Sequence, residues 1–185
     1  GFASRAAGLG LKIHADEFAA SGGSDTAIAV GATSADHLHC LPERNLAGLR
    51  EAGVIPVCLP ATSFFLRMKQ QAPARAIIDA GLPIAIATDG NPGSAMTESM
   101  PLAVTLACLQ YGLQPEEAFA AATINAAAAL KLADRVGRLV PGYAADFQVL
   151  EIPNLRYLPY HFGRSHARDV YCRGRRVVGD GVLRA

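Results

Sequence analysis

The sequence predicts an α/β fold built around a parallel sheet, and three observations lead to this prediction. One plan occurs four times along the chain: a helix end rich in small residues, a glycine, an apolar strand, and polar residues where the strand finishes. The run at 83–87 is apolar throughout, as in strands that are covered on both faces. Strands and helices that alternate in this way form parallel sheets with right-handed crossovers.

The expected elements follow from this plan in chain order. The four strands read LKIHADE, TSADHLH, VIPVCLPAT and PIAIATDG, at residues 11–17, 33–39, 54–62 and 83–90. Helices are expected at 26–30, 42–52, 73–80, 97–112 and 115–132. Ser24 or Asp25 would cap the first helix, and Phe64 and Phe65 lie in a loop before the third. The first ten residues are interpreted as the end of a helix that enters the first strand.

Two architectures fit such a sheet, and a (β/α)8 (TIM) barrel is favoured over a doubly wound sheet. A doubly wound sheet carries a glycine-rich phosphate loop after its first strand, whereas the first strand here ends in HADEF. A barrel places functional side chains at the carboxyl ends of many strands, as all four units do. Four units are half of such a barrel, so residues 1–134 are assigned to a half-barrel.

The composition changes after Leu132, and residues 135–185 are assigned to a small β appendage. Pro141 and Gly142 form a turn between two short strand-like runs, and a hairpin turns near Gly174. The segment between them, with Pro153, Pro159 and several aromatic residues, is expected to be a packed loop.

Composition narrows the function classes. The 185 residues are 51% hydrophobic with a mean hydropathy of +0.22, enough for a sizeable core. The formal charge is +1 and no basic cluster is interleaved with aromatic residues, so nucleic acid is not an expected partner. No apolar stretch approaches the roughly 20 residues that span a bilayer, so no membrane association is expected. The four cysteines are scattered without a CxxC pair, which favours a reduced, cytoplasmic protein.

Polar side chains gather where the strands end, and they suggest a metal site. These residues are His14, Asp16, Glu17, Asp36, His37, His39, Thr88, Asp89 and Asn91. Two imidazoles and a carboxylate from separate strands of one sheet make a metal shell, and a further carboxylate can carry protons. Taken singly, His14 or His37 is more often a hydrogen-bonded core residue than a ligand. Asp89 has an equally good alternative as the cap of the next helix.

The other polar residues carry weaker signals. His39 is expected at the rim, and Asp36 is expected to point toward the helices and to hydrogen-bond the backbone there. Asn91, Gly93 and Ser94 form a turn that can hold an anion or a carbonyl group, with an ordinary turn as the alternative. Packing or solvent-exposed roles are expected for the two late histidines, His161 and His166.

Several motifs resemble the imidazolonepropionase family of the amidohydrolase superfamily. They are HADEF followed by two glycines, GATSADHL, IATDGNPGS, NAAAAL, PGYAADF and LPYHFG, and together they run over nearly the whole chain. The resemblance implies a metal-dependent barrel with a small β-sandwich, one zinc or iron ion, and a homodimer. It also implies hydrolysis of 4-imidazolone-5-propanoate to N-formimidoyl-L-glutamate in histidine degradation, a reaction on a small-molecule substrate.

The resemblance also implies a role for each matching site residue. His14 and Asp89 match the metal-binding residues of the fifth and eighth barrel strands. Glu17 and His37 match groups that contact water and substrate, so the expected catalytic residues are Asp89, His37 and Glu17. The match further implies that Glu17, His37, Asn91, Gly93 and Ser94 bind the substrate.

One departure from the family is large, because the HxH metal pair of the first barrel strand has no counterpart here. The chain is therefore interpreted as the carboxyl-terminal part of a longer enzyme, and alone it is expected to bind metal weakly and to hydrolyse nothing. Two other readings stay open: a different amidohydrolase, such as a ring deaminase or cyclic amide hydrolase, and a non-catalytic half-barrel interaction protein that self-associates.

Overall fold

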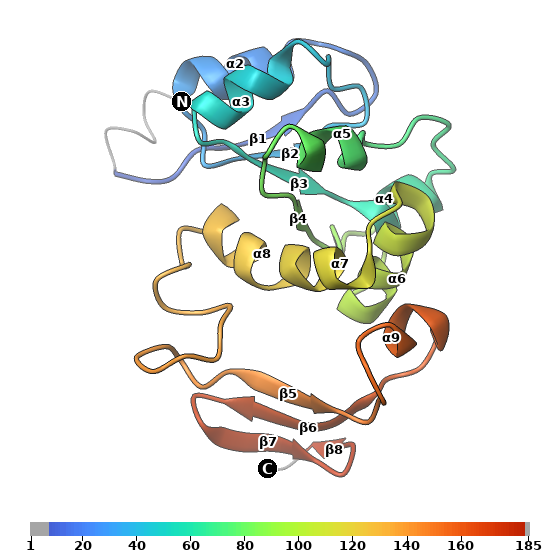
Figure 1. The fold of residues 1–185 in the computed structure, drawn as a ribbon. Coiled ribbons are helices and arrows are strands. Elements are labelled where there is room, and N and C mark those ends of the chain that lie inside the picture. Colours follow the sequence, from blue (N-terminus) through green and yellow to red (C-terminus); the bar gives the residue numbers. More distant parts are fainter. Residues whose placement is uncertain (1–7, 184–185) are drawn as a thin grey trace.

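A computed structural model of the chain describes residues 8–183, which form two separate sheets (Figure 1). The helix end was expected within the first ten residues, of which 1–7 lie outside the described residues and 8–10 are not helical. The first sheet is parallel, with the order β1 (Lys12–Ala15), β2 (Ser34–His37), β3 (Ile55–Cys58) and β4 (Ala85–Ile86). The predicted α/β fold, its four strands and their parallel pairing are therefore confirmed.

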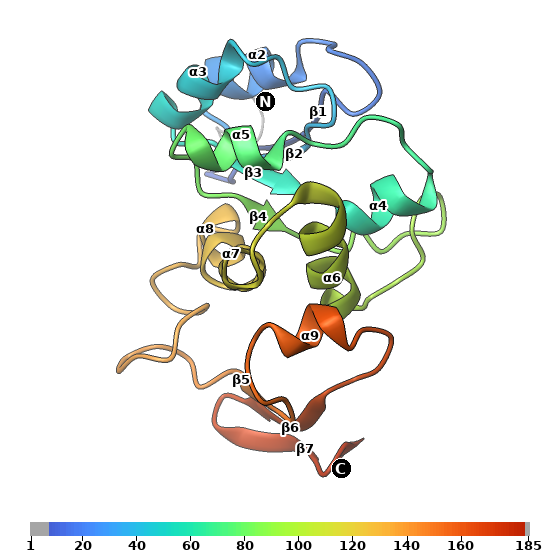
Figure 2. The same cartoon turned by 45° about the vertical axis from the view of Figure 1, so that its right-hand side comes forward.

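Helices cover both faces of the parallel sheet, as the continuous apolar strands predict (Figures 1 and 2). On one face, Ala35 and Ile86 pack in a core formed with α2 (Gly23–Val30), α3 (Asn45–Glu51) and α5 (Ala74–Asp79). On the other face, Val57 and Ala85 lie in register and pack against Ala129 of α8 (Ile124–Ala129). The predicted site residues lie at the carboxyl ends of these strands or just after them.

The first connecting helix begins earlier than the sequence indicated. α2 starts at Gly23, after Gly22 in the left-handed conformation, and neither Ser24 nor Asp25 caps it. A Cβ atom at Gly23 would lie 2.6 Å from Cα of Ala15, so only glycine lets the helix approach the end of β1 this closely. The close approach places the amino end of α2 directly against the site.

Further boundaries differ from expectation, and the long helix expected from Thr97 begins at Met100. The expected strand at 54–62 ends at Cys58, and α4 (Pro60–Phe65) occupies the expected loop with Pro60 in its first turn, where proline suits a helix. The alanine-rich helix is split at Thr123, whose φ of −124° and ψ of −89° are not helical, into α7 (Pro115–Ala122) and α8. The long helix before them, α6 (Met100–Tyr111), is capped by Ser99.

The second sheet is antiparallel and forms the tail of the chain. Its order is β5 (Phe147–Leu150), β6 (Ala167–Cys172), β7 (Arg175–Gly179) and β8 (Val182–Leu183), and the hairpin near Gly174 is confirmed. The strand-like run expected before Pro141 forms no strand, so the turn there does not join two strands. A short helix, α9 (Tyr157–Tyr160), lies within the expected loop and packs on α6 (Figure 2). The boundary at residues 134 and 135 stays a prediction.

No helix within residues 8–183 has both the length and the apolar character required to cross a membrane.

Candidate active site

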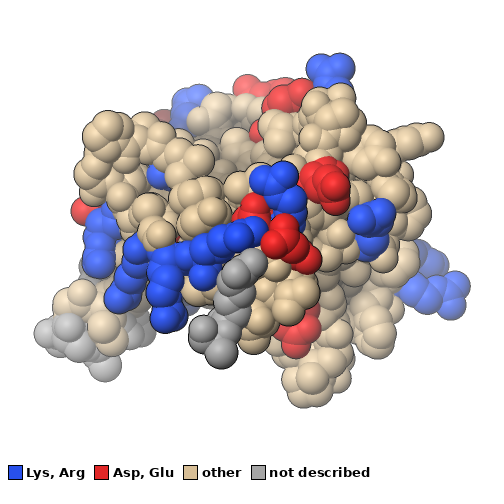
Figure 3. Space-filling view, turned by 90° about the horizontal axis from the view of Figure 1, so that it is seen from below, with Lys and Arg blue, Asp and Glu red and all other residues tan. Residues whose placement is uncertain are grey.

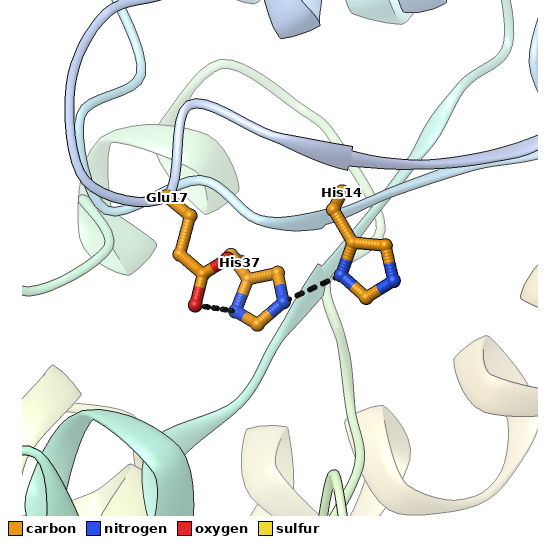
Figure 4. A group of neighbouring side chains, drawn as sticks. All are labelled: His14, Glu17 and His37. Carbon is orange, nitrogen blue, oxygen red and sulfur yellow. Dashed lines mark hydrogen bonds and ion pairs between the residues drawn. The ribbon is translucent and has the colours of Figure 1, made fainter. Parts of the chain in front are cut away.

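Three of the predicted site residues meet at the carboxyl ends of β1 and β2. Potential ligand atoms of His14, Glu17 and His37 all lie within 4.8 Å of one another. Nδ1 of His14 is 2.8 Å from Nε2 of His37, and Nδ1 of His37 is 3.6 Å from Oε1 of Glu17 (Figure 4). The three side chains thus form a row from an exposed imidazole to a carboxylate.

The backbone at the end of β2 explains how the two imidazoles meet. His14 lies in register with Asp36 rather than with His37, and partners in a parallel ladder face the same side of the sheet. His37 has a φ of +74°, which ends the strand's alternation and lets its ring reach His14. The expectation for Asp36 is therefore wrong: it shares the face of His14 and accepts hydrogen bonds from the side chains of Ser34 and Lys12.

Burial favours the neutral form of His37. Its side chain is almost completely enclosed, and burial lowers its pKa below the ordinary 6.5. The charge of Asp89 opposes this shift, and the neighbouring His14 adds to it. A neutral imidazole carries one N–H donor and one lone pair, so His37 can accept from one neighbour while donating to another.

His39 is a buried residue and not the rim histidine that the sequence suggested. It is 0% exposed, and its Nδ1 lies 3.3 Å from the carbonyl oxygen of Glu17. Burial lowers its pKa as well, and the contact with the carbonyl of Glu17 opposes that shift. His39 therefore fixes the backbone that carries the Glu17 carboxylate.

Asp16 is the anchor of the loop that carries Glu17, a role that the sequence analysis did not assign. Its buried carboxylate accepts hydrogen bonds from the backbone N–H groups of Ser21, Gly23 and Ser24 and from the Ser24 hydroxyl. Burial alone would raise the pKa of Asp16, but these hydrogen bonds outweigh it and the pKa is lowered. Asn45 of α3 donates to the same hydroxyl at 2.7 Å and extends the network.

Asp89 follows β4 and lies outside the group formed by the two histidines and Glu17. Its backbone φ is +51°, and its Oδ2 accepts a hydrogen bond of 2.6 Å from Oγ1 of Thr62. Because α6 begins at Met100 and is capped by Ser99, the alternative role of Asp89 as a helix cap is wrong. Thr62 was missed because the expected strand ran through it, although Pro60 signalled the start of a helix.

The turn after Asp89 is held by its own side chains. Oδ1 of Asn91 accepts from the N–H groups of Gly93 and Ser94 at 2.9 and 3.0 Å. Nδ2 of Asn91 donates to the carbonyl of Asp89 and to the Ser94 hydroxyl, both at 2.7 Å. The turn is therefore preorganised next to the carboxylate, and its binding role stays a prediction.

The donors at these strand ends fit a divalent metal ion. Imidazole nitrogens with a carboxylate oxygen are a donor set that zinc and iron accept. Nδ1 of His37 is buried without a hydrogen bond from the described residues, so this nitrogen is available to bind a ligand. The late histidines lie elsewhere: His166 is buried, contacts the carbonyl of His161 at 2.8 Å and packs on Tyr157, which confirms a packing role.

Cavities of the described chain lie away from this site. One of about 700 Å³ is bounded by α6, α7 and the antiparallel sheet, and its lining includes Phe119, Phe147 and Leu158. A smaller one of about 500 Å³ lies beside β6 and includes Arg168. Neither of these two cavities is lined by His14, Glu17, His37 or Asp89.

Comparison with known proteins adds two kinds of finding, of which the first concerns sequence. The model of the amidohydrolase family matches residues 3–177. The imidazolonepropionase of Geobacillus kaustophilus strain HTA426 is 50% identical over 181 residues, covering 98% of this chain and 42% of that protein. The imidazolonepropionase of Symbiobacterium thermophilum is 46% identical over 180 residues, covering 97% of this chain and again 42% of that protein. The chain thus spans less than half the length of these relatives.

The second kind of finding concerns solved structures. An adenosine deaminase from Xanthomonas campestris with bound zinc matches with a TM-score of 0.84 at 22% identity, covering 98% of this chain and 48% of that one. The atrazine chlorohydrolase TrzN from Arthrobacter aurescens TC1, complexed with zinc, matches with a TM-score of 0.75 at 21% identity, covering 98% and 47%. At these identities the likeness shows the fold alone: the chain corresponds to about half of such a structure.

Proposed function

The chain belongs to the amidohydrolase family, and from this premise we propose that it supplies one side of the active site of an imidazolonepropionase. Such an enzyme hydrolyses 4-imidazolone-5-propanoate to N-formimidoyl-L-glutamate in histidine degradation. The observation that carries the proposal is the meeting of His14, Glu17 and His37 at one sheet edge, in a chain 50% identical to an imidazolonepropionase. A cytoplasmic homodimer is part of the same proposal.

His14 and Asp89 are proposed to hold one zinc or iron ion. Such an ion, when bound, lowers the pKa of a water molecule and polarises a carbonyl group. The contacts of His14 favour this role: if its Nδ1–H donates to Nε2 of neutral His37, its own Nε2 keeps a free lone pair. His37 then carries its proton on Nδ1, which lies 3.6 Å from Oε1 of Glu17 without a hydrogen bond from the described residues, so this N–H stays available to the substrate.

The remaining residues are proposed to move one proton and to bind the ring. Asp89 takes a proton from the attacking water and delivers it to the ring nitrogen that departs as the C–N bond breaks. His37 stabilises the oxyanion that develops on the ring carbonyl, and Glu17 orients water or the ring. The preorganised turn of Asn91, Gly93 and Ser94 binds the substrate's polar groups.

A chimera tests the proposal directly. The segment of the Geobacillus kaustophilus relative that matches this chain is replaced by residues 1–185, and consumption of 4-imidazolone-5-propanoate is measured. We expect hydrolysis by the chimera and a loss of at least about 10³-fold in the Asp89→Asn variant, since proton transfer and metal binding both depend on this carboxylate. A folded, zinc-loaded chimera without activity contradicts the proposal, and so does a fully active Asp89→Asn variant.

Further measurements separate the other readings. Release of ammonia from aminated rings by the chimera, without hydrolysis of imidazolonepropanoate, would assign the site to a ring deaminase. The 185-residue chain alone is expected to turn over no substrate, and elemental analysis at neutral pH is expected to find well under one metal equivalent. Size-exclusion chromatography then tests the interaction-protein reading, for which a monodisperse closed assembly is the expected result.

A further inference from the structure

The carboxylate of Asp89 is held on one oxygen only. Oγ1 of Thr62 lies 2.6 Å from Oδ2, and the Ser94 hydroxyl approaches the same oxygen at 3.4 Å. Within residues 8–183, no hydrogen bond or ion pair reaches Oδ1. A distance of 2.6 Å is typical of a hydroxyl that donates to an ionised carboxylate, so the Thr62 contact is the stronger of the two.

Thr62 comes from a rigid part of the structure. It is 0% exposed and lies in the first turn of α4, two residues after Pro60. The next residue, Ser63, is equally buried, and its hydroxyl contacts Tyr111 of α6 at 3.0 Å and donates to the carbonyl of Pro60 at 3.2 Å. Because α4 is fixed to α6 in this way, the Thr62 hydroxyl has a fixed position relative to Asp89.

We propose that Thr62 is a positioning residue that holds Oδ2 of Asp89 and so presents Oδ1 to the metal ion and the reacting water. The inference rests on the proposed function, in which Asp89 binds the ion. The terminal torsion of an aspartate is broad, so a carboxylate without a fixed partner samples many orientations. One hydroxyl on a rigid helix removes this freedom and also separates the roles of the two carboxylate oxygens. Partners of this kind that orient metal ligands are common in metalloenzymes.

The test compares Thr62→Val, which removes the hydroxyl at nearly constant volume, with Thr62→Ser, which keeps it. In the chimera, zinc affinity is measured by competition with a chelator, and kcat and KM are measured for the hydrolysis of 4-imidazolone-5-propanoate. We expect Thr62→Val to weaken zinc binding and to lower kcat by about 10- to 100-fold with little change in KM. Thr62→Ser should restore both values to within a few-fold of the wild type.

A matched control removes a buried hydroxyl elsewhere. Thr105 of α6 is 2% exposed and donates to the carbonyl of Pro101 at 2.9 Å. Thr105→Val should change thermal stability about as much as Thr62→Val, while zinc affinity and kcat stay at wild-type values. Equal zinc affinity and kcat in Thr62→Val and the wild type would overturn the inference, as would equal losses in the two valine variants.

A further experiment tests the positioning role of Thr62 separately from the proposed function. If the wild-type chimera and its Asp89→Asn variant bind zinc equally well and hydrolyse the substrate equally fast, the proposed function has failed. Crystal structures of the wild-type chain and of Thr62→Val then decide the positioning role alone. A rotated or disordered Asp89 carboxylate in the variant supports the role of Thr62, and an unchanged carboxylate overturns it.

Discussion

The two sheets of this molecule bury ionisable groups in opposite ways. At the carboxyl edge of the parallel sheet, His37 is 3% exposed, and burial is the main cause of its lowered pKa. In the antiparallel sheet, Asp169 is 5% exposed, and hydrogen bonds from Arg176 and Arg168 lower its pKa to about 2. Similar enclosure therefore leaves an uncompensated group in one region and a fully paired group in the other.

The difference separates a site from a scaffold. The edge with His14, Glu17 and His37 holds metal-ligating atoms close together, and Nδ1 of His37 has no hydrogen bond from the described residues, so these atoms are available to a ligand (Figure 4). The end of the molecule that carries the antiparallel sheet shows a band of Lys and Arg side chains with acidic side chains beside it (Figure 3). There Asp169 of β6 forms ion pairs with Arg168 and Arg176, and the pair with Arg176 joins β6 to β7.

The largest expected loss of stability comes from Asp16→Ala, at the edge of the parallel sheet. The substitution leaves three backbone N–H groups, of which that of Ser24 is buried, and the buried Ser24 hydroxyl without their acceptor. We expect a loss of about 3 kcal/mol or more in the free energy of unfolding, measured by urea denaturation. Asp25→Ala on the exposed side of the same helix is the control and should change stability by no more than about 0.5 kcal/mol. Equal stability of the two variants would show that Asp16 does not anchor the loop.

The next effect is expected for Gly23→Ala, which tests whether packing fixes the site loop. The added Cβ would lie 2.6 Å from Cα of Ala15 and 2.9 Å from N of Asp16, and backbone atoms cannot move aside locally. We expect a loss of about 1–3 kcal/mol. Gly48→Ala in α3 is the control, because the nearest atom there is the flexible end of Ile28 and alanine favours a helix. A Gly23→Ala variant as stable as Gly48→Ala would contradict the close approach seen at α2.

The sequence was sufficient to predict the sheet and the polar residues that follow its strands. Apolar runs that end in polar residues locate strand ends whatever the tertiary structure, so His14, Glu17, His37 and Asp89 could be found. Their mutual distances could not be predicted, because they depend on single backbone torsions. A φ of +74° at His37 brings its ring to His14, and the regular alternation assumed for Asp36 fails at that same residue.

Hydrogen-bond partners that lie on other helices or strands could not be predicted from the sequence either. The apolar run from Val54 to Leu59 continues into Pro60, so the strand was extended through Thr62, although Pro60 begins a helix. Asp16 was placed at the strand end, but its role depends on how closely α2 approaches β1. These contacts result from packing between elements, which local sequence patterns do not encode.

As the pH falls, the edge of the parallel sheet should lose stability at a higher pH than the antiparallel sheet. The pKa values of His37 and His39 are lowered from 6.5 by burial, so the unfolded chain binds more protons below about pH 6.5. The free energy of unfolding should therefore fall as the pH drops from 6.5 toward 5, measured by urea denaturation followed by circular dichroism. His39→Gln, which keeps a donor for the Glu17 carbonyl, should flatten this slope. A pH-independent stability between 7.5 and 5 in the wild type would contradict the burial of neutral imidazoles.

The smallest effect is expected for Asp169→Asn in the antiparallel sheet. Its partners Arg168 and Arg176 are partly exposed, with side chains 53% and 34% accessible, so solvent screens the two ion pairs. The melting temperature at pH 7 should therefore fall by only a few degrees. The folded-state pKa of Asp169 is depressed, so its contribution is complete above 3.8 and disappears as the pH falls toward about 2. The melting temperatures of the variant and the wild type should therefore converge below pH 3.8, whereas a constant difference would mean that Asp169 acts through shape and not charge. Since the histidines respond below pH 6.5 and Asp169 only below 3.8, melts across both ranges separate the two regions in one chain.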